Sequence, residues 1–259
     1  MSRARWVGRE LGPVLAGVGS LLLVWAVAAE GIDSSSLPSP LAVWRAFLDG
    51  LRDGAIPEAA AKTLLRLTFS FAVAIGVGTA IGVALALNDF ARRSIRPLIV
   101  ALQIAPPIAW LPLAVIWFGL SERAVVFVAF VGAFPSVTLG TMSAFRQVPP
   151  LWRHAGMTLG ARGWELYRSV VFPAALPGYV AGLQQAWGFA WKSLTAGELI
   201  VTGVQATGLG HLLAENQRDV PVLLAAVAVI VAIGTAVDYL VFNQLDRRIR
   251  ARRGLLAPG

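Results

Sequence analysis

The residue types that most often carry out chemistry in proteins are scarce in this sequence, and their spacing excludes several classes of protein. The chain has no cysteine, which removes disulfides, thiol catalysis and zinc–thiolate sites. Its two histidines, His154 and His211, lie 57 residues apart with no ligand spacing around them. Neither of its lysines, Lys62 and Lys192, follows a glycine, so the sequence lacks the phosphate-binding loop of P-loop ATPases.

A few charged and amide side chains in apolar surroundings are candidates for contact with a solute. Lys192 lies within a predicted membrane span, where a charge costs ~2.5–3.5 kcal/mol and attracts an anion. Two other interpretations remain open: its side chain extends toward the interface, or it pairs with Glu198 or Asp238. Glu198 falls at the outer end of the same span, as an interfacial or gate residue would. Gln184 and Gln185 are weaker candidates for the path.

The composition indicates a polytopic membrane protein. Hydrophobic residues make up 57% of the 259-residue chain and charged residues 14%, against about 45–50% and about 25% in soluble domains. In a soluble protein the net charge of +8 would suggest a nucleic-acid partner. Here the arginines lie between apolar runs, so we expect them to set membrane topology instead and expect no nucleic acid.

Six apolar stretches are long enough to cross a bilayer as helices, because ~30 Å of hydrocarbon takes about 20 residues. These stretches are 12–29, 67–87, 98–118, 124–145, 174–200 and 221–242. The first also has features of a signal peptide, with arginines before the apolar run and Ala26-Val27-Ala28 after it, but we expect a retained helix. The sequence therefore predicts an all-α membrane domain over 1–259, with its core at 60–250.

The distribution of basic residues predicts the orientation. With an inner N-terminus, 15 arginines fall in the inner segments before 12, at 88–97, at 146–173 and after 242. The outer segments hold six basic residues, which are Arg45, Arg52, Lys62, Arg66, Arg123 and Arg218. The excess of positive charge inside predicts that both termini are cytoplasmic.

Two connections are long enough to have structure of their own. In the outer one, 30–66, Leu41, Trp44, Leu48 and Leu51 recur at helical spacing, which predicts an amphipathic helix at the outer interface. The inner one reads RQVPPLWRHAGMTLGARGWELYRSVVFP over 146–173. It predicts two short helices, 151–159 and 163–171, joined around Gly160. Such a pair either docks into a partner or forms an ordinary basic loop.

This inner segment resembles the cytoplasmic loop of permease subunits of binding-protein-dependent ABC importers. Their signature is Glu-Ala-Ala, three residues, Gly, nine residues, Ile, one residue, Leu-Pro. Anchored on Gly160, the aligned positions are His154-Ala155-Gly156, Gly160, Val170 and Phe172-Pro173. The glycine, the proline and one alanine match, whereas His154 replaces the glutamate and Gly156 the second alanine.

Other stretches are similar to the nitrate/sulfonate/taurine branch of these permeases. They are LPSP in the outer connection, PPIAWLPLAVIWFGLSE (106–122), FPAALPGYVAGLQQAWGFAWKSLTAGELI (172–200) and GLGHLL (208–213). The resemblance covers essentially 30–250. It implies a type I importer permease for a small anion such as a sulfonate, taurine or nitrate, in a bacterial inner membrane.

The resemblance also implies partners and roles. Two permease copies form the path, two cytoplasmic ATPase subunits bind the inner loops, and an extracytoplasmic binding protein delivers the solute. The chain itself is then no enzyme and binds no cofactor, since ATP-Mg belongs to the ATPase. The expected coupling residues are His154, Ala155, Gly156, Leu159, Gly160, Ala161 and Pro173.

The third apolar stretch is interrupted by Pro106, Pro107 and Pro112, which remove backbone donors. Breaks of this kind are tolerated where the backbone packs in protein or faces water. The third span therefore either lines the path, with Gln103 and Trp110 as lining groups, or has a kink that serves packing only.

Two further features bear on packing and on rival functions. Gly78 and Gly82 form a GxxxG pair in an apolar helix, which predicts a helix-packing face. A stand-alone ion-coupled secondary transporter is the alternative function, but it needs acidic groups in mid-span and only Asp238 comes close. An intramembrane enzyme needs paired catalytic groups at one depth, and the sequence selects no pair.

Overall fold

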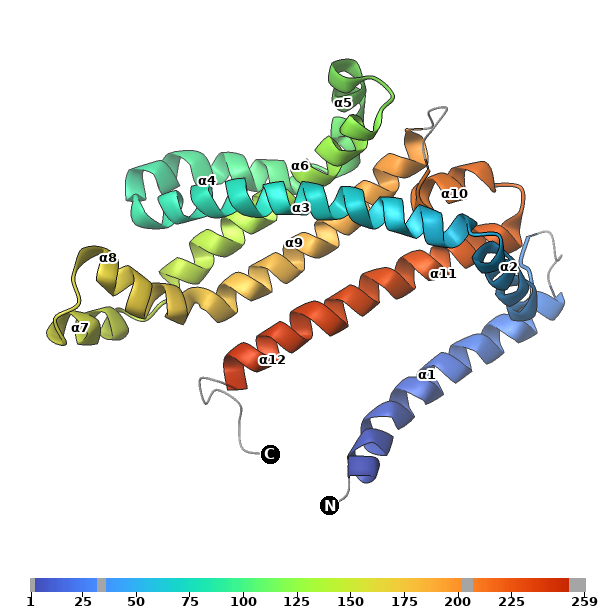
Figure 1. Ribbon diagram of the computed structural model, residues 1–259, viewed down its shortest axis with the longest axis horizontal. Coiled ribbons are helices and arrows are strands. Elements are labelled where there is room, and N and C mark those ends of the chain that lie inside the picture. Colours follow the sequence, from blue (N-terminus) through green and yellow to red (C-terminus); the bar gives the residue numbers. More distant parts are fainter. Residues whose placement is uncertain (1–2, 32–35, 202–206, 252–259) are drawn as a thin grey trace.

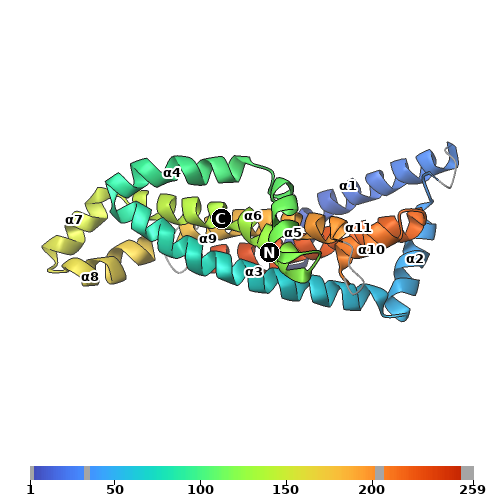
Figure 2. The ribbon, with the colours of Figure 1, turned by 90° about the horizontal axis from the view of Figure 1, so that it is seen from above.

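The computed structural model describes residues 3–31, 36–201 and 207–251, and every regular element in these ranges is helical. The predicted all-α class is therefore confirmed. Figures 1 and 2 both place α7 (Pro150–Thr158) and α8 (Gly163–Leu166) at one end of the long axis. Helices α2 (Pro40–Arg52) and α10 (Leu209–Glu215) lie at the opposite end.

The remaining elements connect these two ends. They are α1 (Arg3–Gly31), α3 (Ala55–Leu87), α4 (Asp89–Ile104), η1 (Pro107–Trp110), α5 (Leu111–Phe118), α6 (Glu122–Arg146), η2 (Tyr167–Val171), α9 (Phe172–Ile200), α11 (Val220–Val237), η3 (Asp238–Asn243) and α12 (Gln244–Ala251). Both η2 and η3 are π-helical. Because η2 runs directly into α9, and α11 through η3 into α12, each series forms one continuous helical rod.

Helix α6 packs against α3 through small residues. A Cβ atom on Gly78 would lie 2.9 Å from Val137 Cβ, and one on Gly82 would lie 2.6 Å from the carbonyl oxygen of Thr138. Only glycine permits backbones this close. The predicted packing role of the Gly78–Gly82 pair is confirmed.

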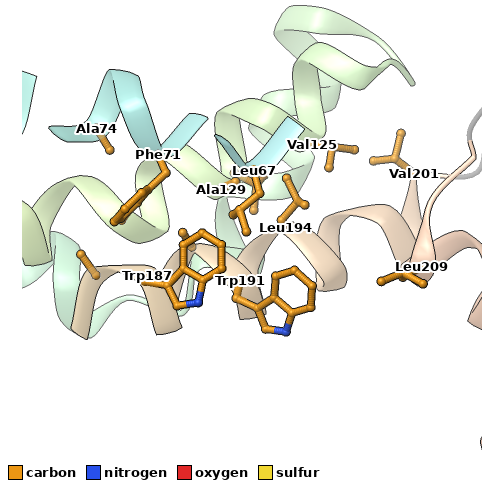
Figure 3. Close-up of a cluster of buried hydrophobic side chains, with 14 of the residues drawn as sticks. Leu67, Phe71, Ala74, Val125, Ala129, Trp187, Trp191, Leu194, Val201 and Leu209 are labelled. Atoms are coloured by element: carbon orange, nitrogen blue, oxygen red, sulfur yellow. The ribbon is translucent and has the colours of Figure 1, made fainter. Parts of the chain in front are cut away.

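On its other side α6 packs against α9 in the same way. At Gly140 and Gly182 the two backbones touch, because a Cβ on Gly140 would lie 2.8 Å from Gly182 Cα. Toward the α10 end, large apolar side chains of all three helices fill the core. Figure 3 shows this cluster, which includes Leu67, Phe71, Val125, Ala129, Trp187, Trp191 and Leu194.

Within the residues that the structure describes, three helical rods are long and apolar enough to cross a membrane, namely α3, α6 and the run Val220–Ile249. A fourth crossing follows if the bent pair of α4 and Pro107–Phe118 counts as one. The apolar part of α1 described in the structure, Ala16–Gly31, is shorter. Six crossings therefore remain a prediction.

Two details of the predicted spans need correction. The third stretch, expected at 98–118, is two helices bent by 97° at Ala105–Pro106, because the two prolines there cannot donate to the preceding turn. The second begins at Ala55 and not at 67. Sequence analysis placed Arg66 in an outer connection. In the structure Arg66 lies inside α3 and is buried.

The predicted amphipathic helix is present as α2. The Ser39 side chain accepts a hydrogen bond from the backbone N–H of Ala42 and caps its first turn. Val43 is buried, whereas Leu41 and Trp44 are exposed on the outside of the molecule. An exposed apolar stripe beside a packed face is the arrangement expected at a membrane interface.

Candidate coupling loop and translocation path

The loop over 146–173 is a helical hairpin closed by glycine. Helix α7 ends in a turn where the backbone N–H of Gly160 donates to Met157 O and that of Ala161 donates to Gly156 O, both at 3.0 Å. Gly160 has φ +98° and Gly163 has φ +52°, values that L side chains rarely adopt. The expected sharp turn at Gly160 is confirmed, and α8 returns the chain through η2 to α9.

The inside of the hairpin is packed tightly around Gly156. A Cβ on Gly156 would lie 2.8 Å from Leu166 Cδ1 and 2.9 Å from Val170 Cγ2. Gly156 therefore holds the two halves of the loop together and does not face outward. Arg153 ties the hairpin to α6, since its Nη2 donates to the carbonyl oxygen of Phe145 at 3.0 Å.

The outside of the hairpin carries exposed apolar side chains. Leu159 is 89% exposed and Trp164 is 78% exposed, and His154 and Ala155 are exposed beside them. Exposed apolar groups gathered at one site mark interaction surfaces. Of the other expected coupling residues, Gly160 lies at the exposed tip, Ala161 is half-buried, and Pro173 is the second residue of α9.

The expected path residues are divided among several places. Gln103 lines a polar groove of about 370 Å³ between α4, α6 and α9, and its Nε2 donates to Ser136 Oγ at 2.9 Å. Gln185 lines the same groove, together with Ser143 and Gln147. All of the side chains around this groove are uncharged.

Gln184 and Lys192 lie on the other side of α9, toward α11. The Gln184 Nε2 atom donates to Asp238 Oδ1 at 2.9 Å. Lys192 and Asp238 both line a second cavity, of about 460 Å³, between α9 and α11. The consecutive glutamines thus face different surroundings, which their spacing on a helix requires.

Glu198 lies in neither cavity and is buried among polar groups. Its carboxylate accepts hydrogen bonds from Arg66 Nη1 at 2.8 Å, from Thr63 Oγ1 at 2.8 Å and from the backbone N–H of Gly210 at 3.1 Å. The side chain of Glu198 is only 2% exposed. The suggested pairing of Lys192 with Glu198 does not occur, because Arg66 takes that position.

Arg66 joins this buried pair to two further segments. Its Nη1 also donates to Thr207 O at 2.6 Å, and its Nη2 donates to Glu122 at the start of α6. Three helices and the segment before α10 therefore meet at one guanidinium. Sequence reasoning missed Arg66 as the buried partner of Glu198, and the only signal for it was an arginine directly before a long apolar run.

The proline-rich break places the last expected path residues at the bend. Pro106 is exposed in the bend, and Pro107 begins the 3-10 turn η1. Trp110 ends that turn half-buried, and its indole N–H has no acceptor among the residues that the structure describes. None of these three residues lines either of the two cavities described above.

Apolar helices long enough to cross a membrane, a polar groove between α4, α6 and α9 and an exposed apolar hairpin at one end are features expected of a membrane transport component. Over residues 74–251 the chain matches the family described as the binding-protein-dependent transport system inner membrane component. It belongs to this family.

Three relatives are permease proteins of ABC transporters or of named transport systems. A putative ABC transporter permease protein of Methanocaldococcus jannaschii is 32% identical over 178 residues, which are 68% of this chain and 66% of that protein. The taurine transport system permease protein TauC of Escherichia coli is 29% identical, covering 96% and 93%. The nitrate import permease protein NrtB of a Synechocystis strain is 27% identical, covering 85% and 83%.

Solved structures share the fold. The MetNI methionine ABC transporter in an inward-facing conformation superposes with a TM-score of 0.62 at 21% identity, over 76% of this chain and 95% of that one. An amino acid ABC transporter crystallised with histidines gives 0.56 at 20% identity, over 80% and 98%. The chain is a permease subunit of a binding-protein-dependent ABC importer and, like the permease subunits of its family, is not an enzyme, because the ATPase of such importers is a separate subunit. Its relatives include permeases of taurine and nitrate transport systems.

Proposed function

We propose that two copies of this chain form the translocation path of an importer driven by two cytoplasmic ATPase subunits and supplied by an extracytoplasmic binding protein. The chain then crosses a bacterial inner membrane six times, with both termini in the cytoplasm. ATP-Mg binds to the ATPase, in keeping with the missing phosphate loop here. Family membership and the arginine distribution support this arrangement.

The observation that carries the ATPase assignment is the hairpin of α7 and α8. Its interior is filled by Gly156, Leu166 and Val170, so the hairpin can move as one body. Its exterior presents Leu159 and Trp164 to a partner. We propose that the ATPase contacts the tip formed by Ala155, Leu159, Gly160 and Ala161, while Gly156 keeps the hairpin of α7 and α8 rigid.

The hairpin has direct mechanical connections to the groove. Arg153 holds it to the end of α6, and η2 passes without a break into α9. Gln103 of α4 and Gln185 of α9 both line the groove, which these two helices form together with α6. Displacement of the hairpin by ATP-driven closure would therefore shift α9 against its neighbours and change access to the groove.

The solute is proposed to be a small anionic or organic molecule of the sulfonate, taurine or nitrate kind. Support comes from the transport named for the relatives TauC and NrtB. The amides and hydroxyls of the polar groove fit such a solute, because they offer hydrogen bonds without a fixed charge that would trap it.

Replacement of Gly160 by valine tests the coupling role. A branched residue at φ +98° costs about 1–3 kcal/mol locally and distorts the tip, so we expect ATP hydrolysis that no longer drives uptake. Gly54→Val is the matched control, because Gly54 has φ +83° and open surroundings at the far end of the molecule. Uptake and ATPase rates of the reconstituted importer give the answer, and normal coupled uptake by Gly160→Val would show that the assignment is wrong.

A further inference from the structure

The cavity between α9 and α11 contains two opposite charges inside apolar helices. Its charged lining residues are Lys192 from α9 and Asp238 from the start of η3, and its walls include Trp187, Trp191 and Thr235. Its volume of about 460 Å³ lies within the range of small-molecule sites. Ionisable residues within membrane helices are costly, and their presence marks a functional site.

The ammonium group of Lys192 lies beside an aromatic ring and not beside a carboxylate in the described parts of the chain. Among the described residues it has no ion pair, and its Nζ lies 5.9 Å from the ring centroid of Phe189. The contact with the ring holds the ammonium at the wall of the cavity by a cation–π attraction. An anionic group inside the cavity would supply the missing partner.

Asp238 is held in a defined orientation. The amide of Gln184 donates to its Oδ1, and Asp238 opens the π-helical segment η3. Single π-helical turns are rare and occur often at functional sites. The Asp238 carboxylate repels a bare anion but attracts an ammonium group in the same cavity.

Two stacked tryptophans form one wall of the cavity. Figure 3 shows Trp187 and Trp191 side by side, with both indole nitrogens on the side away from Leu67 and Phe71. The indole N–H of Trp187 is buried and has no acceptor among the described residues. Because that nitrogen is closed off from solvent, Trp187 gives the cavity an aromatic wall and not a donor for a solute.

We propose that this cavity binds a small zwitterion during transport, with its anionic group at Lys192 and its ammonium at Asp238. The proposal rests on the proposed function and narrows its solute class to amino sulfonates and amino acids. The uncharged polar groove cannot make this selection, because it has no charged side chain to recognise either end. Simple anions would use Lys192 alone and would be disfavoured by Asp238.

Equilibrium binding of radiolabelled taurine to the purified permease–ATPase complex tests the site. Nanodiscs of phosphatidylglycerol, without binding protein, isolate the permease contribution. We expect taurine to bind, and ethanesulfonate, which lacks the amine, to compete at least about tenfold more weakly. Lys192→Met and Asp238→Asn should each weaken taurine binding by about tenfold or more, while Lys192→Arg should retain it.

Matched controls separate the possible outcomes. Lys62→Met removes an exposed lysine paired with Glu58 and should bind taurine as the wild type does. Three results would overturn the zwitterion site and leave the importer assignment intact. They are binding of ethanesulfonate as tight as that of taurine, unchanged taurine binding by both Lys192→Met and Asp238→Asn, and no taurine binding by a complex that performs ATP-driven uptake. Absence of ATP-driven uptake of any solute by the full importer overturns the proposed function instead. Loss of taurine binding when phosphatidylethanolamine is added would identify a lipid headgroup as the occupant and overturn the transport role.

Discussion

At the scale of single residues, the buried pair of Arg66 and Glu198 organises the end of the molecule near α10. Arg66 is 8% exposed, and the Glu198 side chain is 2% exposed. A buried pair is stabilising chiefly relative to the state in which one partner is lost, because the remaining charge then has no compensation. The bonds from Thr63 and Gly210 complete the coordination of the carboxylate.

Glu198→Gln should therefore destabilise the permease by about 3 kcal/mol, because Arg66 loses its buried counter-charge and keeps only the largely exposed Glu122 as an ion-pair partner. Thermal unfolding of the detergent-purified chain would show a clearly lower midpoint. Glu58→Gln is the control on α3, the helix that carries Arg66, since Glu58 pairs with Lys62 at the exposed surface and should leave the midpoint unchanged. Equal midpoints for Glu198→Gln and the wild type would mean that the pair does not hold these helices together.

The sequence identified one half of this pair and missed the other. Glu198 was recognisable as an acid in an apolar run. Arg66 looked like a flanking positive charge, because the apolar stretch begins at the next residue. The two residues are separated by 132 positions, and no local pattern connects residues so distant in the chain. Only the packing of α3 against α9 brings them together.

At the scale of elements, close approach of backbones determines how α3, α6 and α9 pack. Gly78 and Gly82 were predicted to form a packing face, since small residues four apart line one side of a helix. The partner helix was not predictable, because the pattern on α3 does not identify which of the other helices accepts it. The prolines predicted a break in the third stretch, but the angle of 97° depends on how η1 and α5 pack on α6.

Gly82→Ala should disrupt the contact between α3 and α6. The added methyl group would lie 2.6 Å from the Thr138 carbonyl oxygen, so one backbone must shift. Gly76→Ala is the control in the same helix, because a Cβ there meets nothing within 4 Å. Size-exclusion profiles and melting midpoints should show loss of stability for Gly82→Ala alone. Similar behaviour of the two variants would contradict the proposed close contact.

At the scale of the whole molecule, the absence of cysteine makes the proposed orientation easy to test. Single cysteines introduced one at a time provide unique labels, and both Ser94 and Gln217 are exposed. A membrane-impermeant maleimide added to spheroplasts should label Gln217→Cys directly. It should label Ser94→Cys only after the membrane is permeabilised. The reverse pattern would overturn the assignment of the arginine-rich segments to the cytoplasm.

The fold class could be predicted from the sequence, whereas the lateral arrangement of the helices could not. Hydropathy and the loop motif were sufficient for the fold class and the importer family, because both depend on local patterns. The arrangement of the helices could not be predicted from the sequence. This arrangement places Gln103 and Gln185 in one groove and Lys192 at another cavity. Lateral neighbours in a helical bundle depend on contacts between segments far apart in the chain.

The central claim is that this chain transports only as part of an ATP-driven complex. Gentle purification of the tagged chain from its native membrane, followed by mass spectrometry, tests it most directly. We expect an ATPase with a phosphate-binding loop at about one copy per permease, and ATP-dependent uptake when the complex is reconstituted with its binding protein. Recovery of the chain alone, active in proteoliposomes without ATP, would contradict the claim and favour an ion-coupled secondary transporter.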